Sequence, residues 1–213
     1  MAEVITVWLN ANPDPQRGEI LPADFGPIAP LARSLQEHGR HLTVLSDCLP
    51  EGGYPHGASV VAARPGGNPY FHRWAVIADY LAEGGASQVW CVDAGDVEML
   101  TDPGWLPDRL HIGSEGSSVG SPWMRATNPG QGAWIAGNAD LPLLNPGVVG
   151  GDSTTVQAFA RAVTVFGTPD DLTDMGAANQ AAYQLWPDHR TGHPVHTPYK
   201  ADACTPGAWW KHK

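Results

Sequence analysis

Two carboxylates three residues apart follow an apolar run near the middle of the chain. Residues 88–92 have the pattern of a buried strand, and Asp93 and Asp96 come directly after it. In open α/β sheets, ligands bind beyond the carboxyl ends of the strands. Two carboxylates held there repel each other unless a proton or a cation joins them, and their oxygens suit Mg²⁺ and Mn²⁺. The spacing indicates a divalent-metal site able to clamp a departing diphosphate; the alternative is a polar turn in which one aspartate caps a helix.

The elements that must position these carboxylates follow from the patterning of the chain. β-rich apolar runs predict strands at residues 4–9, 41–47, 88–92 and 110–113. Capping and breaking residues predict helices at residues 28–38, 69–82, 153–166 and 171–186, with caps at Asn68 and at Asp152 or Ser153. The connecting segments are predicted to be a loop at 51–68, an insertion or locally mixed region at 102–142, and an apolar run broken by turn residues at 143–151. This alternation predicts an α/β fold with right-handed crossovers and a mostly parallel sheet.

The composition excludes several classes of protein. Twelve basic residues against 22 acidic ones give a net charge of −10, the wrong sign for a non-specific binder of nucleic acid or of an anionic membrane. Apolar residues make up 42%, enough for a core, and no apolar stretch approaches the roughly 18 residues that suggest a membrane span. Three cysteines and an N-terminus without a basic region favour a reducing cytoplasm. Three lysines beside abundant Arg, Ala, Gly and Pro suggest a high-GC bacterium or its phage.

Three further segments, taken together with the carboxylate pair, form a recognisable pattern along the chain. Residues 145–151 read Asn-Pro-Gly-Val-Val-Gly-Gly, residues 174–179 read Asp-Met-Gly-Ala-Ala-Asn, and the chain closes with Trp-Trp-Lys-His-Lys. In this order and spacing, over roughly residues 4–213, the chain resembles nucleotide-sugar-dependent glycosyltransferases of the GT-A fold. Pro146 departs from the pattern, because Ala or Cys is usual there. The resemblance implies one GT-A-type domain over residues 1–213, a Rossmann-like sandwich whose mostly parallel central sheet carries helices on both faces.

The resemblance also implies roles for individual residues. Asp93, Asp96 and His212 would bind the metal, and the imidazole nitrogen favours Mn²⁺ over Mg²⁺. Asp174 would bind sugar hydroxyls or act as the base, and Asn145 would border the transferred sugar. The donor nucleotide sugar would contact Leu9, Asn10, Arg17, Arg73, Asp93, Ala94, Gly147 and Lys213. The acceptor would contact Glu115 and His196.

The expected function is transfer of a hexosyl-type group from a nucleotide diphosphate sugar to a hydroxyl of a protein, a glycan or a lipid-linked acceptor. Two alternatives remain open. Residues 116–120, Gly-Ser-Ser-Val-Gly, fit the G-x-S-x-G pattern of serine hydrolases, with Ser118 as the nucleophile. A non-catalytic carbohydrate-binding protein on the same fold is the other alternative, since the nine tryptophans supply flat apolar surfaces.

Overall fold

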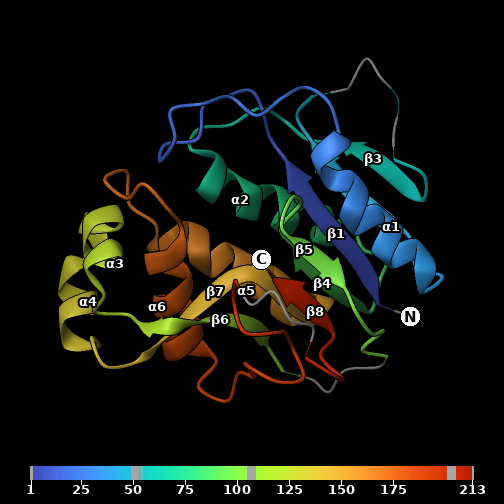
Figure 1. Cartoon of the computed structure of the whole chain (residues 1–213). Coiled ribbons are helices and arrows are strands. Elements are labelled where there is room, and N and C mark those ends of the chain that lie inside the picture. Colours follow the sequence, from blue (N-terminus) through green and yellow to red (C-terminus); the bar gives the residue numbers. More distant parts are fainter. Residues whose placement is uncertain (1, 49–52, 54, 105–108, 201–204, 213) are drawn as a thin grey trace.

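A six-stranded sheet forms the centre of the molecule (Figure 1). The computed structural model describes residues 2–48, 53, 55–104, 109–200 and 205–212. In spatial order the strands of the sheet are β3 (Ala58–Ala62), β2 (Leu42–Ser46), β1 (Glu3–Trp8), β4 (Gln88–Val92), β7 (Pro142–Asp152) and β6 (His111–Ser118). The first four run parallel, and β7 is antiparallel to both of its neighbours, β4 and β6. The predicted α/β class with a mostly parallel sheet is therefore confirmed.

Four helices of two turns or more pack against the sheet. They are α1 (Ala29–Glu37), α2 (Pro69–Ala82), α5 (Ser153–Phe166) and α6 (Met175–Leu185), and two short helices, α3 (Pro122–Thr127) and α4 (Gly132–Gly137), precede β7. The predicted caps of α2 and α5 are confirmed, because the Asn68 side chain accepts a hydrogen bond from the Tyr70 amide at 2.9 Å and Asp152 accepts one from the Thr155 amide at 2.8 Å. Each cap satisfies an amide that the first turn leaves without a partner.

Helices cover both faces of the sheet, because alternate residues of each strand point to opposite faces. On one face, Cys91 of β4 and Val149 of β7 pack in a core with α2, α5 and α6. On the other face, Trp90 and Val148 pack with α1 and with a two-stranded ribbon of β5 (Val97–Met99) and β8 (Trp210–His212). The ribbon also ties down the C-terminal tail, since Trp210 is fully buried.

Within the central sheet, the structure differs from the sequence prediction in β3 and β7. β3 forms where a loop was expected, because an edge strand of small and half-exposed residues has no apolar periodicity to reveal it. β7 is a single strand of eleven residues, whereas its turn residues predicted a break. Those residues form an irregularity within the strand instead, where the register with β6 shifts. The locally mixed region predicted at 102–142 contains the antiparallel strand β6 and the short helices α3 and α4, with residues 105–108 outside the described parts of the chain.

Within the described parts of the chain, no helix combines the length and the apolar character that crossing a membrane requires.

Candidate functional site

A pocket lies where the order of the strands reverses. The chain moves from β1 outward to β2 and β3, and then returns to the other side of β1 as β4. A crevice forms beyond the carboxyl ends of the two strands at such a point. The pocket there has a volume of about 490 Å³, within the range of small-molecule sites. It is lined by Val7, Trp8, Leu9, Asn12, Asp14, Arg17, Leu21, Pro22, Pro27, Pro69, Tyr70, Arg73 and residues 93–96.

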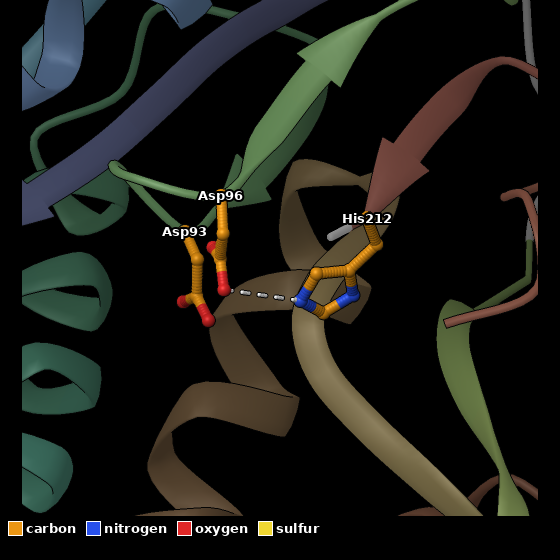
Figure 2. A group of neighbouring side chains, drawn as sticks. All are labelled: Asp93, Asp96 and His212. Atoms are coloured by element: carbon orange, nitrogen blue, oxygen red, sulfur yellow. Dashed lines mark ion pairs between the residues drawn. The ribbon is translucent and has the colours of Figure 1, made fainter. Parts of the chain in front are cut away.

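Three potential metal ligands converge at the edge of this pocket. One ligand atom each from Asp93, Asp96 and His212 lies within 4.8 Å of the others, and Figure 2 shows the Asp96 carboxylate facing the imidazole ring. Asp96 Oδ2 and His212 Nε2 are 3.8 Å apart. The β5–β8 ribbon produces this arrangement, because it pairs His212 with Val97, the residue after Asp96. A side chain from the end of the chain thereby joins the turn that follows β4.

The protonation states in this cluster suit a divalent cation. Burial, and next the charge of Asp93, raise the pKa of Asp96 to about 7. Burial lowers the pKa of His212 to about 4, so the ring is neutral at pH 7. Within the described residues, the buried Nδ1 of His212 has no hydrogen-bond partner, and Nε2 faces Asp96. Two carboxylates and a neutral imidazole form a donor set that fits Mn²⁺.

Arg73 on α2 lies between two carboxylates. Its guanidinium forms an ion pair with Asp93 Oδ1 and bonds Asp174 Oδ2 at 2.7 and 2.8 Å. Trp74 Nε1 also donates to Asp174 Oδ2, at 2.5 Å. Asp174 is only 1% exposed; burial raises its pKa, although the Arg73 charge and the indole donor lower it. This geometry indicates a carboxylate that holds Arg73 in place, and the contact of Asp174 with a sugar or acceptor hydroxyl stays a prediction.

Gly147 of β7 is packed against Asp93 and His212, two of the three potential metal ligands. A Cβ at this position would lie 2.6 Å from Asp93 Oδ2 and 2.6 Å from His212 Cε1. The other oxygen, Asp93 Oδ1, faces Arg73. The absence of a side chain at Gly147 therefore lets Oδ2 and the imidazole ring approach each other.

We expect Gly147→Ala to weaken metal binding more than it weakens folding. The added methyl group must displace Asp93 or His212, so Mn²⁺ affinity falls by about 10–100-fold, as for other disruptions around metal ligands. Overpacking lowers the free energy of unfolding by about 1–3 kcal/mol. Calorimetric titration with Mn²⁺ and thermal unfolding measure the two effects. Gly137→Ala, at an exposed glycine with no atom within 4 Å of the added Cβ, is the control. Unchanged Mn²⁺ affinity in Gly147→Ala would place the metal elsewhere.

The remaining residues predicted to bind the donor divide into two groups. Leu9, Arg17 and Ala94 line the pocket. Asn10 is not among its lining residues, and its backbone amide donates a hydrogen bond to Asp47 Oδ1 at 2.8 Å. Lys213 lies outside the described residues. Tyr70 was missed by the sequence analysis, although it lies three residues before Arg73 on the same helix, a spacing that puts both side chains on one face. Its hydroxyl donates to Asp14 Oδ2 at 3.2 Å.

Of the two residues predicted to bind the acceptor, Glu115 lies on β6 and His196 contacts that strand. Asn145 donates to Glu115 Oε1 at 2.8 Å and accepts a hydrogen bond from the Gly147 amide at 2.8 Å. His196 is buried, accepts a hydrogen bond from the Ser114 amide at 2.9 Å, and uses its other nitrogen toward the Thr197 carbonyl. Its contact with an acceptor stays a prediction. Within the described residues, no hydrogen bond joins the Ser118 hydroxyl to a histidine, as a hydrolase triad would require.

Comparisons with protein-family models and with curated proteins gave no match to this chain.

Proposed function

We propose that this protein is a divalent-metal-dependent glycosyltransferase of the GT-A type. It transfers a sugar from a nucleotide diphosphate sugar to a hydroxyl of a protein, glycan or lipid-linked acceptor. The observation that carries the proposal is the meeting of Asp93, Asp96 and His212 at the edge of a 490 Å³ pocket. A mostly parallel sheet with helices on both faces fits the GT-A type.

The convergence of the separate sequence motifs adds support. Residue 147 contacts both Asp93 and His212, and Asp174 is joined to Asp93 through Arg73. Four segments far apart in the sequence thus surround one centre. Motif matches that arose by chance would be scattered over the fold.

The pocket suits the nucleotide portion of such a donor. Trp8, Leu9 and three prolines form apolar walls, while Asn12, Arg17 and other polar groups can fix the orientation of a ligand. At the edge of the pocket, the metal ligands are placed to meet a diphosphate. A cation bound there would neutralise the charge that develops on the departing nucleoside diphosphate. Arg73, charged and held between two carboxylates, adds a fixed positive group beside it.

The proposal predicts that one nucleoside diphosphate stabilises the protein only together with Mn²⁺. A ligand that binds only the folded state at a hundredfold excess over its Kd adds about 2.7 kcal/mol. That corresponds to a rise in Tm of about 5–10 °C for a chain of this length. Thermal unfolding with a panel of nucleoside diphosphates, with Mn²⁺ or with EDTA, measures the effect. The matching nucleoside monophosphates are the control, since they lack the second phosphate. A panel in which no nucleotide raises Tm, or in which the rise persists in EDTA, contradicts the proposal.

A further inference from the structure

Two neighbouring strands are irregular at the same level of the sheet, beside the metal cluster. Ile112 of β6 pairs with Val149 of β7, but the next residue, Gly113, pairs with Asn145, so three residues of β7 bulge outward. Further along, Ser114 pairs with Leu144 and Ser118 with Pro142, so β6 bulges in turn. Bulges redirect side chains and occur often beside active sites. The bulge of β6 contains Glu115.

Glu115 is connected to the metal cluster by a chain of short contacts. Its Oε1 accepts from the Asn145 amide group, and Asn145 Oδ1 accepts from the backbone amide of Gly147, each at 2.8 Å. Gly147 packs directly against Asp93 and His212. Since β4, β7 and β6 are successive neighbours in the sheet, the backbones at Asp93 and Glu115 are separated by at least two strand spacings, about 10 Å. A sugar unit fits in such an interval.

The order of these groups matches the parts of a transfer reaction. The nucleotide pocket lies at β1 and α2, the metal cluster follows at the end of β4, and Glu115 lies beyond it on β6. A donor whose diphosphate meets the metal ligands would direct its sugar away from the pocket, toward Glu115. Asp174 is not available at that position, because it is 1% exposed and its Oδ2 already accepts from Arg73 and Trp74.

We infer that Glu115 is the general base that deprotonates the acceptor hydroxyl, an assignment that rests on the proposed function. The acceptor O–H proton passes to Oε2 of Glu115, the oxygen that Asn145 does not hold, and the acceptor oxygen forms its bond to the anomeric carbon. The bond from that carbon to the diphosphate oxygen breaks, and its electron pair leaves with the nucleoside diphosphate. Attack from the side opposite the leaving group inverts the anomeric centre. The Asn145 amide holds Oε1, so that Oε2 is aimed at the acceptor.

The surroundings of Glu115 suit this role. Burial raises its pKa, while the hydrogen bond from Asn145 and the charge of Lys200 lower the pKa. Tyr199 is the other titratable group whose charge interacts with Glu115, and its ring lies edge-on to His212 with centroids 4.8 Å apart. A carboxylate whose pKa is raised toward neutrality accepts a proton more readily in the transition state. The rate is therefore expected to fall as the pH drops through the pKa of Glu115.

The test compares Glu115→Gln with wild type for release of nucleoside diphosphate from a panel of nucleotide sugars with Mn²⁺, with water as the acceptor. We expect the rate to fall by about 10²–10⁴-fold, the usual contribution of a general base. At saturating Mn²⁺, where the protonation of Asp96 no longer limits metal binding, we expect the acidic limb due to Glu115 to disappear from the pH profile. The rise in Tm with nucleoside diphosphate and Mn²⁺ should be unchanged, since donor binding does not involve this side chain. Asp140→Asn, at an exposed carboxylate before β7, is the matched control and should leave the rate unchanged.

Azide, used as the acceptor in place of water, distinguishes a general base at Glu115 from a residue that only supports the structure. Azide is already an anion and loses no proton when it attacks, so its transfer rate should be the same in Glu115→Gln as in wild type. A structural role would lower the rates with azide and with water alike, and that result overturns the assignment. So does an undiminished rate with water, or a wild type that binds nucleotide with Mn²⁺ and releases no diphosphate. Absence of any Mn²⁺-dependent nucleotide binding would instead refute the proposed function itself.

Discussion

Replacing Asp96 with asparagine is expected to abolish Mn²⁺-dependent nucleotide binding and to leave the protein folded. Asp96 supplies one of the two carboxylates of the cluster, and its side chain is 43% exposed. Without it, one carboxylate and one imidazole remain, too few ligands to hold the ion at micromolar concentrations. We expect Mn²⁺ affinity to fall at least 100-fold and the Tm rise with nucleoside diphosphate to vanish. Calorimetric titration and thermal unfolding of the variant measure both.

The ligand-free variant should be at least as stable as wild type at pH 8. The pKa of Asp96 is raised from 3.8 to about 7 in the folded chain. The stability that this group contributes is therefore complete below about pH 4 and is lost as the pH rises through 7. Asparagine removes that loss. A variant that unfolds at a much lower temperature would show that Asp96 supports the fold and would contradict its assignment as a metal ligand.

Metal binding should depend on pH for the same reason. Below pH 7 the proton on Asp96 must leave before the ion can bind, so Mn²⁺ affinity falls by up to about tenfold per pH unit. His212 adds no such dependence between pH 5 and 8, since burial lowers its pKa to about 4. Titrations at pH 6 in buffers of different ionisation enthalpy count the protons released. About one proton per ion is expected.

Among these substitutions, Arg73→Met is expected to lower the free energy of unfolding the most. It leaves Asp174, which is 1% exposed, without its counter-charge. Removing one partner of a buried ion pair costs about 3–5 kcal/mol. Tm should fall by about 6–20 °C in a chain of this length. The loss should be greater at pH 8 than at pH 5, because the pKa of the buried Asp174 is raised and rises further without Arg73, so its stabilising protonated form is lost as the pH increases.

The double variant Arg73→Met/Asp174→Asn is the control for this loss. Asparagine keeps an oxygen for the indole of Trp74 and carries no charge, so the double variant should regain a large part of the lost stability. Chemical unfolding of wild type, the single variant and the double variant measures the difference. A double variant no more stable than Arg73→Met would show that the packing of the arginine, and not its charge, holds this region.

The sequence predicts the parts of the site that local interactions determine. Asn68 marks the start of α2 because its side chain caps a neighbouring amide, and the buried run of β4 places Asp93 at a strand end. Contacts between distant segments escaped local patterning. The β5–β8 ribbon that brings His212 beside Asp96 consists of two three-residue strands, too short to show a period.

Asp174 shows the same limit. The sequence predicted a helix from residue 171, but α6 begins after Asp174, whose carboxylate forms no cap and turns to α2 instead. Its partner Arg73 lies 101 residues earlier in the chain. The link between Glu115 and Asn145 depends on bulges in two strands whose register the sequence does not reveal. The sequence thus indicated which residues belong to the site, but it did not indicate which partners the charged groups contact.

The most direct measurement is an anomalous difference map from crystals grown with Mn²⁺ and the nucleoside diphosphate that raises Tm most. We expect one strong manganese peak bounded by Asp93, Asp96 and His212, with the two phosphates on the ion and the base in the pocket beside Leu9 and Tyr70. A manganese peak away from these three residues, or a nucleotide bound outside this pocket, would contradict this expectation.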